Sequence, residues 1–499
     1  MLMRRICQSM MTYRNSILSL FLLGAWVLLL SPMPSFAQAQ NMAETANAAS
    51  SKDIQIDWRG HLKGQGRYQA YRDGSVYQPL GFQEQASLNS DTRLNFTASR
   101  QQFSVEVDYQ LLSQVGDEVE LSRRFVEAAN DPISGLFIPG ILNDDRRLFD
   151  FTHTLSQGER HQWVHRLDRA NLAYIDDQWV VKLGRQAISW GNGLMYNPMD
   201  IFNPFSPTQV DTEYKSGDDM LYGQYLTQDG DDLQMVWVVR RDLLGKVNAE
   251  HDSIAAKYHL FWQPDWLGQP VDEPIEVDFL LAEHFRDYIA AVGLTQSLGD
   301  ALWRTDIMLT HVAATQIPTT LQASPTLAAE ELPAENVASL VSNLSYSWLW
   351  QPLQTGGGFN MNGSLEYFYN GFGQADGEYS PEQLVANPAL LSRLARGELY
   401  SLGRHYVAAS VTMELTPLWL ITPTALVNLS DHSALLQLVS QHDIQQNLQL
   451  LFSLNVPVGP IGTEFGGLEL AGVPLDLQTD SPLHIGQQVS AQLQLAWYF

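Results

Sequence analysis

The chain ends Val489-Ser-Ala-Gln-Leu-Gln-Leu-Ala-Trp-Tyr-Phe499, and this stretch decides how the rest of the sequence is interpreted. Every second residue counted back from Phe499 is apolar, and most residues between them are polar. Successive residues of a β-strand point to opposite faces. The ending therefore predicts a strand with one apolar face and one polar face.

The same period of two appears at the other end of the chain, over Ile54 to Tyr71. Its even positions are apolar or small, and its odd positions are polar except for Tyr71. Nine to eleven residues suffice for a tilted strand to cross a bilayer. We expect a strand here that spans a membrane and projects beyond it.

The first residues have the features of a secretory signal peptide. Arg4, Arg5 and Arg14 precede an apolar run over 17–30, and small residues follow at Ser35 and Ala37. The run is short for a membrane-spanning helix, which needs about 20 residues, so an uncleaved anchor is the weaker alternative. We predict a signal peptide over 1–37, a flexible periplasmic lead-in over 38–53, and one barrel domain over 54–499.

Composition narrows the class of protein further. The 499 residues include 55 acidic and 29 basic side chains, a net charge of −26, which excludes nucleic acid as a partner. After Leu30 no apolar run approaches 18 residues, yet the chain has 13 Trp, 19 Tyr and 20 Phe. The only cysteine, Cys7, lies in the predicted leader. These features favour a transmembrane β-barrel in the outer membrane of a Gram-negative bacterium, exported by the general secretory route.

Alternating segments predict an all-β, antiparallel up-and-down barrel of about 18 strands, with 16 or 14 as alternatives. Most long connections follow odd-numbered segments and most short ones follow even-numbered segments, as expected for long external loops and short periplasmic turns. Ser380-Pro381-Glu382-Gln383 predicts a helix over 381–395, and a second is expected near 121–129. The predicted strands begin near residues 54, 86, 101, 164, 178, 219, 232, 252, 274, 287, 301, 336, 357, 400, 418, 433, 444 and 485.

The last strand also resembles the C-terminal signature strand of bacterial outer-membrane barrels, which ends in Phe with apolar residues at every second position before it. That resemblance implies that the barrel-assembly machinery reads Phe499, Trp497 and Leu495 as an insertion signal. A periplasmic last residue and a periplasmic first strand require an even number of strands.

The polar strand faces are expected to line an aqueous lumen, because a barrel of 16–18 strands is wide enough to hold one. A basic strip facing acidic strips would create a transverse field, as in selective pores. The alternative is that these charges pair with one another and only brace the barrel. The pore-lining candidates are Arg59, His61, Lys63, Arg67, Asp91, Arg93, Glu106, Asp108, Glu366 and Arg404.

One long connection, within Leu183 to Pro207, is too apolar for a loop in water. Its glycines and three Asn-Pro or Ser-Pro pairs favour tight, stiff turns. We expect it to fold into the barrel mouth and constrict it; a packed structural plug is the alternative. Asp211, Glu213, Asp218 and Asp219 follow, and a solvated acidic loop is favoured over a Ca²⁺ site. The constriction candidates are Arg185, Gln186, Trp190, Asn197, Asp200 and Asn203.

This loop and the segment Glu366-Tyr-Phe-Tyr-Asn-Gly-Phe-Gly373 resemble a poorly characterised proteobacterial family of porin-like outer-membrane barrels, reminiscent of alginate-export porins. The family shares an Arg-Gln…Trp-Gly stretch followed by an Asn-Pro-rich loop. The resemblance implies transport across the outer membrane, with a periplasmic or inner-membrane pump as a potential partner. Acidic residues outnumber basic ones about two to one here, which argues against alginate, a polyanion.

The sequence thus favours an outer-membrane channel for small solutes. The alternative is the outer-membrane component of an export route for lipid-like or polymeric material, and an outer-membrane enzyme ranks third. No Gly-x-Ser-x-Gly, His-Glu-x-x-His or Walker motif occurs, so no catalytic residue, metal or cofactor is predicted. The expected partners are outer-membrane lipid and lipopolysaccharide, and the oligomeric state stays open.

Overall fold

The computed structural model describes residues 53–128, 143–242, 244–263, 265–266, 269–270, 273–313, 315–316, 331–332, 334–351, 358–470 and 483–499. The predicted signal peptide and nearly all of the lead-in lie outside the described residues. Among those described, no helix is long and apolar enough to cross a membrane.

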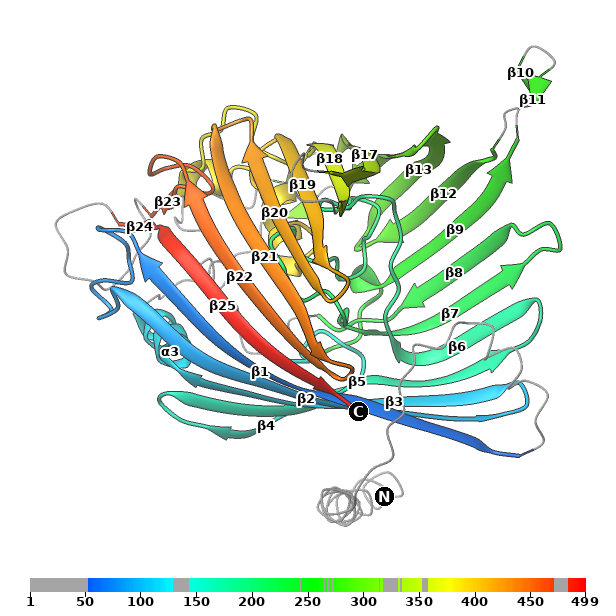
Figure 1. Ribbon diagram of the computed structural model, residues 1–499, viewed down its shortest axis with the longest axis horizontal. Coiled ribbons are helices and arrows are strands. Elements are labelled where there is room, and N and C mark those ends of the chain that lie inside the picture. Colours follow the sequence, from blue (N-terminus) through cyan, green and yellow to red (C-terminus); the bar gives the residue numbers. More distant parts are fainter. Residues whose placement is uncertain are drawn as a thin grey trace. The chain divides into compact units, whose positions relative to one another are not determined.

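Eighteen antiparallel strands form a closed ring (Figure 1), which confirms the predicted fold class and strand number. The observed strands begin within five residues of the predicted positions. The ring strands are β1 (Gln55–Tyr71), β2 (Glu84–Arg100), β3 (Phe103–Gly116), β5 (His161–Ile175), β6 (Trp179–Gln186), β7 (Asp218–Leu226), β8 (Asp232–Val238), β9 (Ser253–Trp262), β12 (Ile275–His284), β13 (Asp287–Leu298), β14 (Ala301–Val312), β17 (Glu335–Trp350), β18 (Phe359–Tyr369), β19 (His405–Thr416), β20 (Trp419–Asn428), β21 (Ser433–Gln445), β22 (Leu448–Val458) and β25 (Gln487–Tyr498).

The first and last strands close the ring. β1 pairs with β2 from Gln55 to Ala70, and its other edge pairs with β25 from His61 to Tyr71. Closure pairs both edges of β1 from His61 onward, and residues 55–60 extend beyond the end of β25. The amphipathic ending of the chain is therefore the strand that completes the wall.

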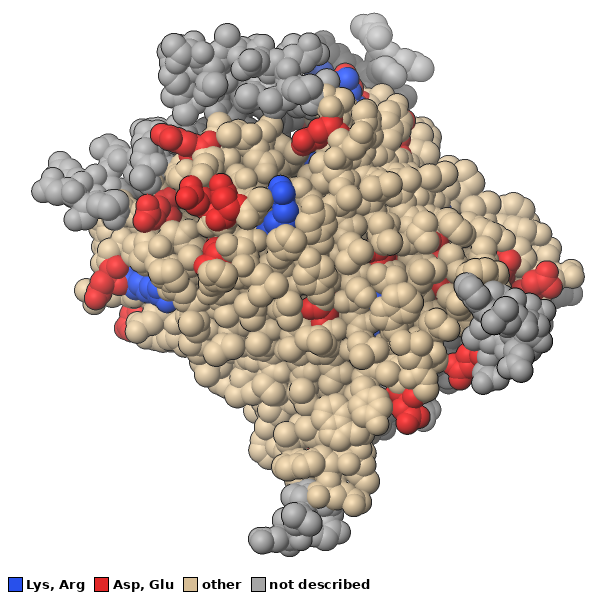
Figure 2. All heavy atoms as spheres, turned by 90° about the horizontal axis from the view of Figure 1, so that it is seen from above, with Lys and Arg blue, Asp and Glu red and all other residues tan. Residues whose placement is uncertain are grey.

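The outward face of the wall is apolar. Leu365 is 56 % exposed and Trp497 is 45 % exposed, while the residues between such positions point inward. Figure 2 shows a wide face of the molecule on which charged side chains are sparse. An apolar outer band with aromatic residues is the surface that a barrel presents to lipid.

The connections differ in length between the two ends of the barrel, which we call the loop end and the turn end. The loop end holds the five long connections that the sequence predicted, observed as 117–160, 187–217, 313–334, 370–404 and 459–486. It also holds the connections 72–83, 239–252, 285–286 and 429–432. The turn end holds mostly short turns, such as 101–102 and 299–300.

Both predicted helical regions contain helices. The first is α3 (Asp117–Ala128), and the second is two helices, α4 (Pro381–Val385) and α5 (Pro388–Arg396), where one was expected. Ser380 and Gln383 form the predicted capping box, and Asn387 caps α5 ahead of Pro388, which breaks the helix in two. The remaining short elements are β4 (Thr152–Gln157), η2 (Ala249–His251), β10 (Asp265–Trp266), β11 (Gln269–Pro270), β15 (Thr315–Gln316), β16 (Glu331–Leu332), β23 (Leu468–Glu469) and β24 (His484–Ile485).

One part of the wall is built in an unusual way. β6 pairs with β5 only over Ala170 to Ile175, toward the turn end. Toward the loop end, β4 pairs with β5 over Gln162 to Arg166 instead. The segment before β4 reaches the residues that follow β8, where Arg147 bridges to Arg240. β4 and this segment thus form the wall beyond the short strand β6.

Candidate functional site

The connection from β6 to β7, residues 187–217, is called the plug loop below. Its turns require glycine at two positions. Gly191 has a φ of +88°, and a Cβ on Gly193 would overlap the carbonyl of Tyr196. The loop then makes contacts with strands on both sides of the barrel.

A single carboxylate holds the first half of the plug loop. Glu366 on β18 accepts hydrogen bonds from the backbone N–H groups of Leu194, Met195 and Tyr196, at 2.6, 3.0 and 2.8 Å. Glu366 is buried. Three consecutive amides around one carboxylate form a nest for an anion. The two segments that carry the family resemblance therefore meet in space.

Asn192 fixes the loop to the neighbouring strands. Its backbone N–H and its side-chain amide both donate to Asp306 on β14, at 2.7 and 2.8 Å. Thr295 on β13 donates to its side-chain oxygen, and Asn343 on β17 donates to its carbonyl. Asn192 thus binds three strands at once.

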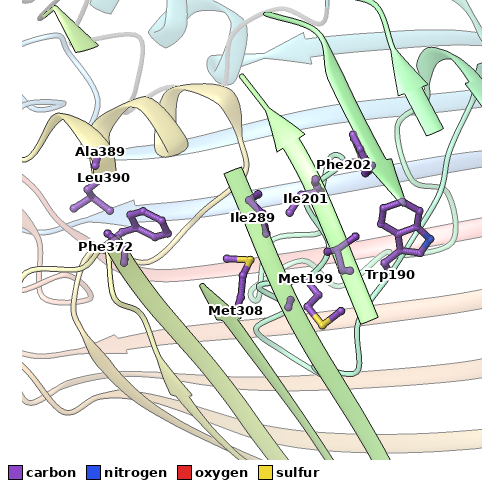
Figure 3. Packing of buried hydrophobic residues seen from close by; sticks show 14 of the residues in the cluster. Trp190, Met199, Ile201, Phe202, Ile289, Met308, Phe372, Ala389 and Leu390 are labelled. Carbon is purple, nitrogen blue, oxygen red and sulfur yellow. The ribbon is translucent and has the colours of Figure 1, made fainter. Parts of the chain in front are cut away.

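Apolar contacts support these hydrogen bonds. Trp190, Met199, Ile201 and Phe202 of the plug loop pack in one buried cluster with inward-facing residues of the wall and with the loop over 370–404 (Figure 3). Tyr196 belongs to a separate cluster and stacks on Phe368, with ring centroids 4.9 Å apart. The first half of the plug loop is therefore a packed core, the alternative that the sequence left open.

The second half of the plug loop binds the opposite wall. Lys63 on β1 lies 2.6 Å from the carboxylate of Asp211 and 2.7 Å from that of Glu213. On β25, Gln494 donates to Asp211 and Tyr498 donates to Glu213. β13 and β14 are the tenth and eleventh of the 18 ring strands when β1 is the first. The plug loop therefore joins diametrically opposite strands and crosses the lumen.

An ion pair lies inside the loop itself. Asp200 accepts from Lys215 at 2.5 Å, and Lys215 also donates to the carbonyl of Ile188. Burial raises the pKa of Asp200 to about 6 although Lys215 lies beside it, and burial lowers the pKa of Lys215. The pair links the two ends of the loop at a cost in desolvation.

A network of arginines and aspartates holds the start of the plug loop. One of its members, Asp144, was not predicted from the sequence. Arg185 on β6 donates to Asp144 and to Asp219 on β7. Burial alone would raise the pKa of Asp144, but hydrogen bonding by Arg185 and the charge of Arg147 outweigh it and lower the pKa to about 2. Asp144 lies in a connection without periodicity, so no local pattern marked it.

The four acidic residues considered as a solvated loop or a Ca²⁺ site are instead paired with cations. Asp211 and Glu213 bind Lys63, as described above. Asp218 pairs with Arg240, and Asp219 pairs with Arg185. Asp218 and Asp219 are buried at the start of β7, so the expected solvated loop does not extend to them, whereas Glu213 is exposed and Asp211 is half-buried in the loop.

Several of the remaining pore-lining candidates are buried beside charged residues of neighbouring strands. Arg93 is buried between Asp108 and Asp168, at 3.0 and 2.6 Å, and its guanidinium lies over the ring of Tyr214 of the plug loop. His61 is buried beside Asp91. These charges pair across neighbouring strands, as the bracing alternative expects.

Four other pore-lining candidates lie away from these buried residues. Arg59 is exposed, and Arg67 reaches Glu118 on α3. Glu106 accepts from Asn171 on β5. Arg404 was expected within a strand, but β19 begins one residue later and Arg404 donates to the carbonyl of Gly373.

Some of the constriction candidates lie in the plug loop, and others lie at the end of β6. Trp190 donates to Gln234 on β8, and Asn197 donates to the carbonyl of Trp190. Asn203, at a positive φ of 51°, donates to the carbonyl of Ser216. Arg185 and Gln186 lie at the end of β6 and not in the loop itself.

The inner wall is not polar throughout, contrary to the expectation that polar faces alone line the lumen. From β7 to β17, buried polar residues such as Asp306 face inward beside a set of buried apolar ones near the plug loop: Met220, Val236, Val238, Leu280, Ile289, Met308 and Val337. The sequence predicted that this loop folds into the barrel mouth, but it did not show which strands supply the apolar residues that pack against it.

A serine, a histidine and a glutamate form a hydrogen-bonded series. Ser253 lies 2.8 Å from Nδ1 of His284, and Nε2 of His284 lies 2.9 Å from Glu398. This order of groups is that of a hydrolase triad. However, Ser253 is 1 % exposed and its hydroxyl accepts from Arg240, which leaves no approach for a carbonyl substrate. The series joins the wall to the loop over 370–404.

A second buried carboxyl group lies in the last loop. Glu464 accepts hydrogen bonds from Tyr406 at 2.5 Å, Asn428 at 2.7 Å and the backbone N–H of Leu402 at 3.1 Å. Burial raises the pKa of Glu464 to about 7, although the Tyr406 hydrogen bond acts in the opposite direction. Glu464 thus links the last loop to the loop over 370–404.

No protein-family model matches the chain, and no curated protein matches it. Solved structures do. Acinetobacter baumannii OccAB4 is similar over 90 % of this chain and 99 % of its own, with a TM-score of 0.46 and 8 % identity. Pseudomonas aeruginosa OccK5 covers 89 % and 98 %, with a TM-score of 0.43 and 8 % identity. Wzi of Escherichia coli, an outer-membrane carbohydrate-binding β-barrel involved in group 1 capsule assembly, covers 91 % and 86 %, with a TM-score of 0.42 and 12 % identity. At these values the similarity concerns the fold alone.

Proposed function

We propose that the chain is an outer-membrane channel for small solutes, narrowed by its plug loop. The observation that carries the proposal is that the plug loop binds opposite walls, through Asn192 and Glu366 on one side and Lys63 on the other. A loop that crosses the lumen divides a wide barrel into narrow passages, which select solutes by size and charge.

The closed ring and its apolar outer face support insertion into a membrane. The crossing loop argues against free passage of a polymer, because its ion pairs and packed core would have to separate first. The structure therefore favours small solutes over the export of polymeric material.

Planar-bilayer recordings on the purified, folded protein test the proposal. We expect a small single-channel conductance that rises severalfold when residues 190–207 are replaced by a short Gly/Ser linker. A folded protein that conducts in neither form would contradict the proposal.

A further inference from the structure

A cavity of about 240 Å³ lies inside the barrel, between the plug loop and the wall formed by β25, β1, β2, β3 and β5. Five carboxamide side chains share its lining, together with Lys63, Asp91 and Asp211. This space is large enough to hold several water molecules. That is room for a solute of monosaccharide size. The carboxamides are Gln65, Asn89, Gln114, Gln162 and Gln494.

Three of these amides donate within the protein, among them Asn89, which donates to Glu118 on α3, but the lining also keeps unpaired atoms. Gln65 donates to Gln494, which donates to Asp211. Gln162 is 4 % exposed, and its Nε2 donates to no group of the described residues. Oδ1 of Asn89 and Oδ1 of Asp91 likewise accept from none of them. Buried polar atoms without partners are costly, so a lining that keeps several of them indicates a ligand.

The charges of the cavity indicate the class of ligand. Lys63 is already paired with Asp211 and Glu213. Asp91 accepts from Gln110 through its other oxygen. The cavity therefore offers an amide donor and two acceptors, and its lysine is already neutralised. An anion would face two carboxylates, and Lys63, the only basic residue of the described lining, is already paired with carboxylates.

We propose that this cavity binds a neutral polyhydroxylated solute, such as a monosaccharide. Each hydroxyl both donates and accepts, so a few of them satisfy Nε2 of Gln162 and the free oxygens of Asn89 and Asp91 together. Leu112 and Val164, which also line the cavity, give an apolar surface for the C–H groups of a sugar ring. This inference rests on the proposed function for access to the lumen, but binding is measured without it.

The test is saturation-transfer NMR on the full-length protein in detergent micelles, with D-glucose, D-glucosamine and D-glucuronate as probes of matched size. We expect D-glucose to bind and D-glucuronate to bind at least roughly tenfold more weakly. Gln162→Met keeps the length of the side chain and removes the amide, and should weaken D-glucose binding roughly three- to tenfold. Gln449→Met is the matched control, because Gln449 binds Asp443 on the neighbouring strand and does not line the cavity.

No D-glucose binding, or binding that Gln162→Met leaves unchanged, would overturn the inference. Tighter binding of D-glucosamine than of D-glucose by tenfold would also overturn it and make the cavity a cation site. These results are distinct from failure of the channel proposal, which is seen in bilayer recordings. A conducting protein that binds no sugar contradicts only the inference, and a sugar-binding protein that never conducts contradicts only the channel.

Discussion

Glu366 shows at the scale of one residue how a buried charge positions a loop. Its carboxylate accepts from three consecutive amides of the plug loop. Hydrogen bonds to a charged group contribute about 1.5–3 kcal/mol each, and the loss of a partner leaves buried amides unpaired. The position of the first half of the loop therefore depends on the charge of this side chain.

We expect Glu366→Gln to loosen the plug loop, because the amide has one accepting oxygen in place of two and lacks the charge. Bilayer recordings should show a higher or more variable conductance than in the wild type. Glu106→Gln is the control, since Glu106 accepts from Asn171 on the wall and does not contact the loop. Equal conductance of all three proteins would show that Glu366 does not hold the plug loop.

Glu464 predicts a pH dependence of stability. Its pKa is raised from 4.5 to about 7, so the folded state favours the protonated form. The contribution is complete below about pH 4.5 and is lost as the pH rises through 7. Thermal unfolding in detergent should give a Tm lower at pH 8 than at pH 5 by roughly 2–4 °C.

Glu464→Gln isolates this effect from other groups that titrate in the same range. The variant keeps the hydrogen-bonding shape and cannot ionise, so the part of the Tm shift due to Glu464 should vanish. If the variant and the wild type shift equally between pH 5 and pH 8, the buried carboxyl group does not control stability.

The sequence predicted the direction of single side chains better than it predicted their partners. The inward direction of Glu366, Lys63 and Arg93 followed from the period of two alone. Their partners did not, because Glu366 meets residues more than 150 positions away, and strand periodicity carries no information on such distances. Asp144 was missed since it lies in an irregular connection.

At the scale of elements, the plug loop is held in two independent halves. Asn192 and Glu366 fix the first half, whereas the second half depends on the contacts of Asp211 and Glu213 with β1 and β25. Removing one set of contacts should therefore leave the other in place.

Lys63→Met should release only the second half of the loop. It leaves Asp211 and Glu213 without their cation, so the lumen becomes more negative and should favour cations more strongly. The reversal potential across a KCl gradient measures this change. Lys246→Met is the control, because Lys246 is exposed in the connection 239–252. An unchanged reversal potential in Lys63→Met would contradict the role of this contact.

Strands were predicted more reliably than loops for a physical reason. A strand in this wall contacts lipid on one face and the lumen on the other, so its sequence alternates along its whole length. The plug loop has no such period. Its apolar residues indicated that it folds inward, but the strands that receive it are set by the closure of the whole ring.

At the scale of the whole molecule, assembly depends on the last strand. β25 pairs with both β22 and β1 and completes the ring. The resemblance of this strand to an insertion signal predicts that Phe499→Ala lowers the yield of assembled barrel in the outer membrane roughly tenfold, as seen by heat-modifiable migration on gels. Phe103→Ala, a change at an exposed aromatic residue of the outer face, is the control. Equal yields of the two variants would argue against the signal.

The wall beyond β6 has a consequence for engineering. β4 pairs with β5, and Arg147 before it bridges to Arg240, just after β8, so this part of the loop end is formed without residues 187–217. The plug loop is thus an insert between two strand ends whose surroundings are already complete. One scaffold could accept loops of different length and charge there, and so serve as a family of filters that share the same outer shell.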